Sequence, residues 1–455
     1  MAAPPQRDAG GEDLISNLPF VLLSAIIARL ATAEAARTAV LSTRWLDAWR
    51  GTPLRLDDLE LPAAPCSTIA RAAAASGAPW AARADAVSLA LASHPGPVDR
   101  FRLSRTTLRA RVPAAEAWFR DLAAGDRRAR EVSLVCPPEW CHRALADPLL
   151  ASPTLETLAL GECRFSDAGA SAASASRLTE LSLSFTHISE VALQSLLAGC
   201  PALRCIMLRH IQGPRRIHIS SCRSLVLLGV WQYKNLEELT VEDAPRLERL
   251  LGDTHLGTAV TIVSAPKLTA LGYLVVGFRN FLPGIDKPGD QKILAISTTF
   301  SSKKNMDLVM NLLKCFPFLE TLHIEKKRGE KEFHTIDSNY YHMLCPIGCI
   351  VNHLKSVRVE IKIESEDENQ NILEFVCFVL ANAQVLEIMK IESALSDNPA
   401  WITEQQDVLS QCHRASMEAK VVFKGLKVIR RKGLSIEAVN ALPDPFDSDI
   451  DIMGY

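Results

Sequence analysis

Residues 178–208, LTELSLSFTHISEVALQSLLAGCPALRCIML, contain the spacing L-x-x-L-x-L twice. The first copy begins at Leu178 and the second at Leu203, where isoleucine takes the middle position. Alternating apolar residues indicate a short strand with one buried face, because successive side chains of a strand point to opposite sides. The leucine three positions earlier indicates a turn that buries one more side chain. Each such unit leaves its two ends apolar, so neighbouring units must stack.

The same spacing recurs along most of the chain. The first four clear copies start 23, 25 and 22 residues apart, which is within the range of leucine-rich repeats. Any chain rich in leucine produces some such spacings by chance, but several copies also follow a proline two residues before the first leucine. The pattern becomes irregular after Tyr273, before a loop rich in proline and glycine at Leu282–Asp290. The nine copies start at Leu155, Leu178, Leu203, Leu225, Leu236, Leu268, Leu319, Leu354 and Leu386, with weaker echoes from Ala84 and Ala129.

The composition is that of an ordinary globular protein. The 455 residues are 48% hydrophobic, 22% charged and 6% aromatic, which excludes wholesale disorder and a collagen-like fibre and suggests about three domains. The 50 basic and 52 acidic residues give a net charge of −2, which disfavours a general nucleic-acid binder or a polybasic membrane protein. The longest apolar runs fall far short of the roughly 20 residues that span a bilayer.

The N-terminal sequence, MAAPPQRDAGGED, has no apolar segment typical of a secretory signal, and it is too acidic for a transit peptide. We therefore expect a protein of the cytoplasm or the nucleus. In those compartments the twelve cysteines would be reduced, and most would be buried as small apolar side chains.

The region between Leu14 and Arg50 has the pattern of three short helices. Apolar residues recur every four positions in the first, and the third has two tryptophans four residues apart on one face. Three short helices cannot bury this much apolar surface by themselves, which indicates a partner. The predicted helices cover Leu18–Leu30, 33–41 and 43–50, with Pro19 in the first turn, Thr32 before the second helix and Ser42 as the cap of the third.

The run DLISNLPFVLLSAIIARLATAEAARTAVLSTRWLDAWR, which starts at Asp13, closely resembles an F-box in the version common among plant proteins. The family pattern is matched by Leu18-Pro19, by two pairs of aliphatic residues and by Ala35–Trp45, and a second tryptophan follows four residues later. The sequence departs from the family at Phe20, which is usually acidic, and at Ala31, which is usually proline. A plain three-helix bundle with two tryptophans in its core is the alternative.

The resemblance implies docking onto a Skp-type adaptor of a cullin-based ubiquitin ligase. Aliphatic side chains and large aromatic rings would fill a complementary apolar surface, as in other helix-in-groove interfaces. Of the implied contacts, Leu22, Ile26, Trp45 and Trp49 are expected to carry most of the binding energy. The full set of implied adaptor contacts is Leu18, Pro19, Leu22, Leu23, Ile26, Leu41, Ser42, Trp45 and Trp49.

A second resemblance covers about Cys345–Lys424. The string A-N-A-x-V-L at Ala381–Leu386, preceded by CPIGC at Cys345–Cys349, resembles the FBD domain of plant F-box proteins with leucine-rich repeats. It implies no biochemical role. The same residues also fit two more strand-and-helix units that close the solenoid, which is the interpretation we favour, with a helix at Asn371–Ala381 after an acidic loop at Glu364–Asn369 and a last strand at Ala419–Phe423.

The sequence offers no recognisable catalytic or metal-binding motif. It lacks the glycine-rich nucleotide loops, the H-E-x-x-H zinc motif and the serine-hydrolase elbow. Two groups of potential zinc ligands are spaced too tightly for the usual knuckles, and a basic patch at Lys326–Lys331 is typical of a solvated loop. We therefore expect no catalytic residue, no metal and no cofactor. The two groups are His342, Cys345, Cys349 and His353, and Cys136, Cys141 and His142.

The expected fold is α/β, with an N-terminal three-helix F-box followed by a curved leucine-rich-repeat solenoid and a C-terminal FBD cap. The expected function is that of a non-catalytic, substrate-recruiting subunit of an SCF-type ligase, with an adaptor and an unknown target as partners and without nucleic acid or membrane. The alternatives are an adaptor-bound scaffold without a ubiquitylation substrate and, more weakly, an enzyme with an unrecognised site. We also expect the F-box and the repeats to fold separately. The predicted ranges are 1–12 disordered, 13–58 F-box, 59–83 connecting segment, 84–344 repeats, 345–424 FBD-type region continuing the solenoid, and 425–455 tail, which is disordered and acidic after Leu442.

Overall fold

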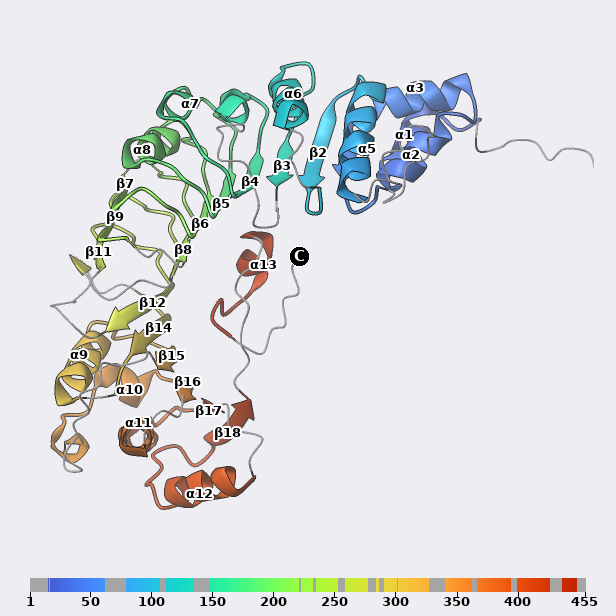
Figure 1. The fold of residues 1–455 in the computed structure, drawn as a ribbon. Helices are drawn as coiled ribbons and strands as arrows, with labels where there is room; N and C mark the ends of the chain where they lie inside the picture. The colour runs from blue at the N-terminus through green and yellow to red at the C-terminus, as the bar shows by residue number, and fades with distance from the viewer. Residues whose placement is uncertain are drawn as a thin grey trace, which may run out of the picture. The chain divides into compact units, whose positions relative to one another are not determined.

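A computed structural model of the chain shows a mixed α/β fold of helices and parallel strands (Figure 1). The chain divides into two units by its internal packing, residues 1–165 with 172–177 and residues 166–171 with 178–455. The predicted disordered segment 1–12 lies outside the described residues, as does most of the predicted connecting segment 59–83. The structure describes residues 15, 17–61, 79–106, 112–134, 147–220, 222–231, 235–252, 258–276, 284–285, 290–300, 302–326, 340–361, 366–393, 399–425 and 436–447.

Three short helices begin the first unit: α1 (Phe20–Ile27), α2 (Thr32–Thr38) and α3 (Thr43–Gly51). The predicted cap of α3 is confirmed, because the Ser42 Oγ accepts a hydrogen bond from the Trp45 backbone nitrogen at 3.3 Å. The three predicted helices are therefore present.

A parallel sheet with the order β1-β2-β3-β4 follows these helices in the first unit. The weak repeat echo at Ala129 is confirmed as a strand, but the echo at Ala84 is wrong, because that residue lies in a helix. The elements are β1 (Leu54–Asp57), α5 (Pro79–Ser93), β2 (Val98–Leu103), α6 (Val112–Ala123), β3 (Glu131–Leu134), η1 (Asp147–Ala151) and β4 (Thr157–Gly161).

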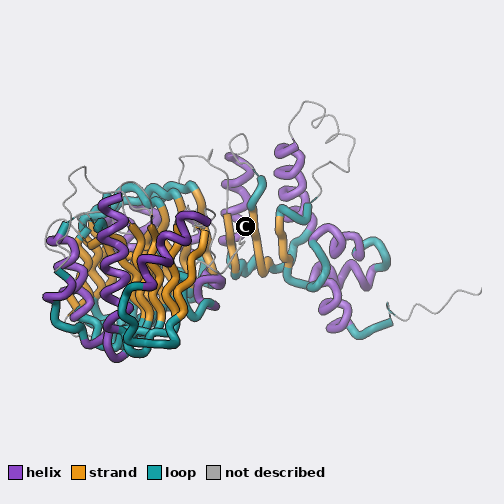
Figure 2. Tube along the Cα trace, turned by 90° about the horizontal axis from the view of Figure 1, so that it is seen from below, coloured by secondary structure: helices purple, strands orange, loops and turns teal. Residues whose placement is uncertain are grey.

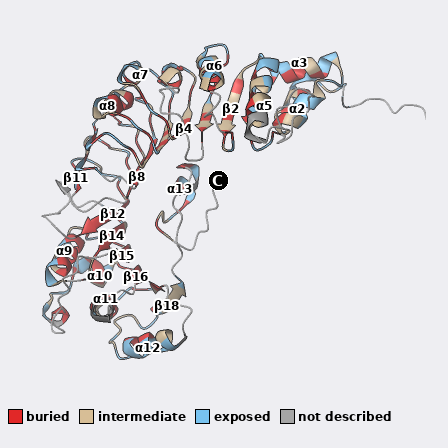
Figure 3. Cartoon of the chain, viewed as in Figure 1, coloured by how far each residue is buried: buried red, intermediate tan, exposed pale blue. Residues whose placement is uncertain are grey.

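The second unit is organised around a long parallel sheet with the order β5-β6-β8-β10-β12-β14-β15-β16-β17-β18 (Figure 2). The repeat leucines of these strands are buried, so the core follows the sheet from β5 to β17, whereas β18 at the edge has no buried residue (Figure 3). The strands are β5 (Glu180–Ser184), β6 (Cys205–Arg209), β8 (Leu227–Trp231), β10 (Arg249–Gly252), β12 (Ala270–Val276), β14 (Ile293–Thr298), β15 (Thr321–Lys326), β16 (Ser356–Ile361), β17 (Ile388–Ser393) and β18 (Lys420–Gly425).

Helices and a second, smaller sheet accompany the long sheet of this unit. The small sheet has the order β13-β11-β9-β7, and its pairs are also parallel. Its strands are β7 (Arg216–Ile219), β9 (Glu238–Val241), β11 (Ala259–Ile262) and β13 (Gly284–Ile285). The helices are α7 (Asp167–Ser171), α8 (Glu190–Ala198), α9 (Lys303–Lys314), η2 (Tyr341–Met343), α10 (Gly348–Asn352), α11 (Glu366–Asn382), α12 (Pro399–Ser410) and α13 (Ile436–Ala441). None of the helices in the described ranges combines the length and hydropathy needed to cross a bilayer.

Eight of the nine predicted repeat copies coincide with strands of the two main sheets, and two details differ. The copy that starts at Leu236 forms β9 of the small sheet, because its spacing is the same but its strand pairs with β7 and β11. In β12 the register shifts between Leu271 and Leu274, so Leu274 takes the third repeat position opposite Ile296. Tyr273, predicted as a repeat position, instead contacts the C-terminal segment.

Four further expectations near the C-terminus are corrected. The predicted acidic loop at Glu364–Asn369 is wrong from Glu366 onward, where α11 begins. The prediction of a disordered tail after Leu442 is wrong for residues 443–447, because Phe446 is buried against the long sheet. Lys326 is not in a solvated loop but buried at the end of β15. Cys377 and Cys412 form a disulfide and are not reduced thiols.

Candidate protein-interaction surface

The core of the three N-terminal helices is formed by side chains that the sequence placed at a partner interface. Leu23 is fully buried, and Trp45 and Trp49 are 4% and 6% exposed. The two tryptophans lie one helical turn apart on α3, where they pack together with the buried side of α1. Because their side chains are already enclosed, these three residues are corrected from surface anchors to core residues of the bundle.

Other predicted contacts do lie on the surface. Leu22 and Ile26 are exposed on α1, one turn apart, and Leu41 is 64% exposed in the turn between α2 and α3. Pro19 is exposed before α1, whereas Leu18 and Ser42 are partly buried. The structure thus leaves two places for a partner, the outer side of α1 and the α2–α3 turn.

Sequence reasoning missed three exposed apolar residues in the same two places and a fourth, Ile15, before α1. Val40, next to Leu41, is 86% exposed, and Val21 on α1 is 75% exposed. The signal was present in the first helix, FVLLSAII, which is apolar on almost every side and cannot bury all of it in a three-helix bundle. The exposed apolar residues of α1, of the α2–α3 turn and of the stretch before α1 are together called the apolar patch below; they are Ile15, Phe20, Val21, Leu22, Ile26, Val40 and Leu41.

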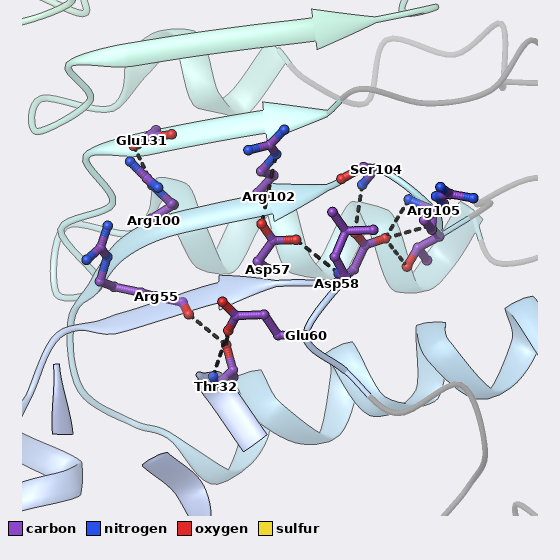
Figure 4. Close-up of polar contacts among 12 residues, drawn as sticks. Thr32, Arg55, Asp57, Asp58, Glu60, Arg100, Arg102, Ser104, Arg105 and Glu131 are labelled. Atoms are coloured by element: carbon purple, nitrogen blue, oxygen red, sulfur yellow. Dashed lines mark hydrogen bonds and ion pairs between the residues drawn. The ribbon is translucent and has the colours of Figure 1, made fainter. Parts of the chain in front are cut away.

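The helices that carry the apolar patch are joined to the sheet of the first unit by backbone pairing. β1 starts three residues after α3 and pairs in parallel with β2. At the start of α2, the Thr32 Oγ1 donates to the Arg55 carbonyl at 2.7 Å and the Thr32 nitrogen donates to Glu60 Oε2 at 2.8 Å (Figure 4). The first solenoid strand therefore lies inside the range predicted for the F-box.

A buried carboxylate fixes the end of β1 to the end of β2. Asp58 is fully buried, and Oδ1 accepts a hydrogen bond from the Ser104 nitrogen at 2.8 Å (Figure 4). Its Oδ2 accepts hydrogen bonds from the nitrogens of Arg105 and Thr106 at 2.8 and 2.6 Å and from the Thr106 hydroxyl at 2.8 Å. Four donors satisfy one buried charge, which is the condition under which such a charge is tolerated.

A histidine fixes α3 to the loop before β2. His94 is buried, and its Nε2 donates to the carbonyls of Trp49 at 3.1 Å and Thr52 at 3.0 Å, since both partners are acceptors. Burial lowers the pKa of His94, and the nearby Arg127 charge lowers it further, against the opposing effect of the carbonyls. At Gly96 in the same loop, a Cβ would lie 2.2 Å from the Arg50 carbonyl oxygen, so only glycine permits this approach.

These contacts correct the expectation of separate folding units. The predicted F-box range 13–58 is tied to the residues after it by the buried Asp58, by the pairing of β1 with β2 and by His94, which contacts the end of α3. We conclude that the helices and the start of the solenoid form one folding unit.

The two groups of closely spaced histidines and cysteines, which we expected not to bind zinc, are described only in part. Cys345 is exposed, whereas Cys349 is buried and donates to the Leu313 carbonyl at 3.4 Å. The side chain of His342 and the whole of the group at 136–142 lie outside the described residues. Within the part of the chain that the structure describes, no three histidine, cysteine or acidic side chains come together as metal ligands would.

Family models match three regions of the chain in order. The F-box domain model matches residues 15–57 and the FBD model matches residues 342–391. Between them, the model described as FBD-associated F-box protein At5g56370, LRR repeats, matches residues 115–285 and 290–324.

Curated relatives come from Arabidopsis thaliana. The F-box/FBD/LRR-repeat protein At1g13570 is 24% identical over 446 residues, which cover 90% of this chain and 98% of that protein. The F-box/FBD/LRR-repeat protein At5g22660 is 50% identical over 50 residues, about 11% of either chain. The F-box protein At5g03100 is 26% identical over 227 residues, which cover 49% of this chain and 66% of the relative. The chain therefore contains F-box, leucine-rich-repeat and FBD regions, and it is similar along nearly its whole length to a plant F-box/FBD/LRR-repeat protein.

Proposed function

We propose that this protein is the target-recruiting subunit of an SCF-type cullin ubiquitin ligase. Its apolar patch would dock onto a Skp-type adaptor, and its repeats would hold the target protein. The observation that carries the proposal is the apolar patch itself, because seven large apolar side chains stand in water on a domain that matches the F-box model. Exposed apolar surface of this extent on a small helical bundle is typical of a protein interface.

The proposed division of work needs no reacting group from this chain. A target bound to the repeats would be held near a ubiquitin-charged enzyme, and its local concentration at the thioester would be high. The geometry of such an assembly depends on a stiff connection between the adaptor site and the repeats. The buried contacts of Asp58 and His94 supply that stiffness at the start of the solenoid. We place the proposed ligase in the cytoplasm or the nucleus.

A second candidate function is that of an adaptor-bound scaffold without a ubiquitylation target. Both functions use the apolar patch, so adaptor binding does not separate them. A protein that binds the repeats and accumulates when this chain is deleted would favour target recruitment, whereas a bound protein of unchanged abundance would favour the scaffold.

Charge substitution in the apolar patch tests adaptor binding directly. The full chain is co-expressed with a Skp-type adaptor and purified as the wild type and with Val40→Asp and Leu41→Asp together. Both side chains are exposed in a turn, so the fold tolerates the change, while two carboxylates buried in an apolar interface should reduce adaptor recovery at least tenfold.

The matched control is Val191→Asp, because Val191 is 68% exposed on α8 in the second unit. It should leave adaptor recovery unchanged. Equal recovery with the double variant and the wild type, with both proteins folded by circular dichroism, would refute the proposed docking surface.

A further inference from the structure

The last described segment of the chain, residues 436–447, packs against the face of the long sheet that the helices α8 and α9 do not cover. Figure 1 shows α13 on the side of the strands opposite to α8 and α9. Ile436, Val439 and Phe446 are buried there. Their apolar surroundings are side chains of β6, β8, β10, β12 and β14, namely Cys205, Met207, Leu227, Trp231, Leu251, Ala270, Tyr273, Ala295 and the partly buried Ile293.

Three basic residues form a row on the same side of the sheet. His323 on β15 lies opposite Arg358 on β16, and Arg358 lies opposite Lys390 on β17. Neighbouring parallel strands lie about 4.8 Å apart, so the three side chains are spaced evenly across the sheet. They are called the basic row below.

Each member of the basic row contacts the C-terminal segment. His323 Nε2 lies 2.8 Å from Asp444 Oδ2, Arg358 Nη1 donates to the Phe446 carbonyl at 3.2 Å, and Lys390 Nζ lies 3.3 Å from Asp447 Oδ1. Burial raises the pKa of the Asp444 carboxyl, but the His323 hydrogen bond and charge outweigh it, so the net shift is downward. The segment therefore presents its charges in the order that the strands present theirs.

Between its two carboxylates the segment inserts an aromatic ring. The Phe446 ring meets Tyr273 edge-on, with centroids 5.2 Å apart, and lies 5.8 Å from the His323 ring. The Tyr273 hydroxyl accepts from Arg358 Nη1 at 3.2 Å, and Arg358 Nη2 donates to Glu392 at 2.7 Å. Because Arg358 and Glu392 are both buried, the guanidinium is held in place by the sheet.

The segment has little means of keeping this structure by itself. α13 has six residues, which is too short to be a stable helix in water. Its order comes from the sheet, through Arg249 Nη1, which donates to the Val439 carbonyl at 2.7 Å, and through the basic row. These contacts of residues 444–447 with the sheet are all made by side chains of the sheet, and Asp-Pro-Phe-Asp itself forms a turn, in which the Asp447 nitrogen donates to the Asp444 carbonyl at 3.4 Å.

We propose that this surface, formed by Tyr273 and the basic row, is the target-binding site, and that its ligand is a turn of a protein chain in which an aromatic residue stands between two carboxylates. Residues 444–447 occupy the site in the absence of a target and mimic that ligand. That the ligand is a protein to be ubiquitylated rests on the proposed function, but the binding of the ligand to this surface does not. A tethered mimic competes at an effective concentration in the millimolar range, so the target must exceed it in affinity or in number of contacts.

The test is a peptide with the sequence of residues 440–447, NALPDPFD, labelled with a fluorophore and titrated with the full chain. The wild-type chain should bind the peptide weakly, because its own segment fills the site. A chain with Asp444→Asn and Phe446→Ala should bind at least tenfold more tightly. The matched control is Glu437→Gln, an exposed carboxylate on α13, which should behave as the wild type.

A charge exchange locates the peptide on the basic row. In the chain with the freed site, Lys390→Glu should abolish binding of the original peptide. A peptide with lysine in place of Asp447 should recover it, which a variant that merely misfolds cannot do.

The inference is overturned if the chain with Asp444→Asn and Phe446→Ala binds the peptide no better than the wild type does. It is also overturned if the lysine peptide does not bind the Lys390→Glu chain although that chain keeps the melting temperature of the chain from which it was made. Neither result depends on adaptor recovery. Either one would therefore refute the inference while the proposed function still stood. Loss of adaptor binding with intact peptide binding would refute the proposed function alone.

Discussion

The helices at the start of the chain and the segment at its end are both non-repeat elements packed on repeat strands, and they are held in different ways. At the start, backbone pairing of β1 with β2 is reinforced by Asp58, whose four donors include three backbone nitrogens. At the end, residues 444–447 are held by side chains of the sheet and form no strand with it.

The difference indicates which part of the molecule is permanent and which can be exchanged. Backbone pairing and a buried charge can only be lost by unfolding, because each leaves unsatisfied groups behind. Side-chain contacts to a short peptide can be replaced by the same contacts to another peptide. We therefore expect substitutions at the start to change global stability and substitutions at the end to change local opening.

The largest effect is expected for Asp58→Asn. The substitution keeps the shape but turns an amide group toward backbone N–H donors, so at least one buried donor loses its acceptor. We expect a loss of about 3 kcal/mol in the free energy of unfolding of the first unit, the range for a charged hydrogen-bond acceptor. Urea unfolding measures it, monitored by tryptophan fluorescence, to which Trp45, Trp49 and Trp118 of the first unit contribute together with tryptophans of the second unit.

The control for this variant is Asp47→Asn, an exposed aspartate on α3. It should change stability by no more than about 0.5 kcal/mol, as surface substitutions usually do. If Asp58→Asn behaves like the control, the start of the chain is not held as argued.

Some features of the N-terminal helices could be predicted from the sequence and others could not. Ser42 was predictable as a cap because the residue type and its place before an apolar helix coincide in the chain. The burial of Trp45 and Trp49 was not, because a helix with an aromatic stripe can point it at its own bundle or at a partner. The same choice determines which apolar residues, such as Val40, remain exposed on the surface of the bundle.

The strands show the same limit. β1 has only two buried leucines in four residues, too short a pattern to be recognised. The run from Ala84 to Leu89 has the spacing i, i+3 and i+5, and its alanines favour the helix that forms. The repeat at Leu236 fits the strand pattern but cannot say which sheet it joins.

The C-terminal segment illustrates a different failure. Its composition, PDPFDSDID, is typical of disorder because it contains little apolar surface of its own. The order of residues 443–447 depends on Tyr273 and the basic row, which are distant in sequence and lie on the face of the long sheet opposite to α8 and α9. The composition of a segment cannot predict contacts with side chains that are distant in the sequence.

An intermediate effect is expected for Phe446→Ala, which tests the other side of the contrast. Removing the ring frees residues 436–447 from the sheet, so their amides should lose hydrogen-exchange protection at least tenfold. The global free energy of unfolding should fall by less than about 1 kcal/mol, because the released segment opens locally. A larger global loss would show that the segment is part of the core and not an exchangeable element.

The smallest effect is expected from the titration of His94. Its pKa is lowered in the folded chain, chiefly because burial disfavours the charged imidazole and also because Arg127, paired with Asp121, lies nearby. The unfolded chain therefore takes up a proton first as the pH falls below the ordinary value of 6.5, and the folded chain does so only at lower pH. The contribution of His94 to stability is thus complete above pH 6.5 and declines as the pH falls from there. In His94→Gln the amide can still donate to the Trp49 or Thr52 carbonyl but does not titrate, so the loss of stability between pH 8 and pH 5.5 should be smaller than in the wild type.

His413→Gln, at an exposed position in the second unit, should retain the wild-type pH dependence in parallel urea titrations. If His94→Gln and the wild type lose the same stability over this range, His94 is not held neutral at the junction between α3 and the first repeats.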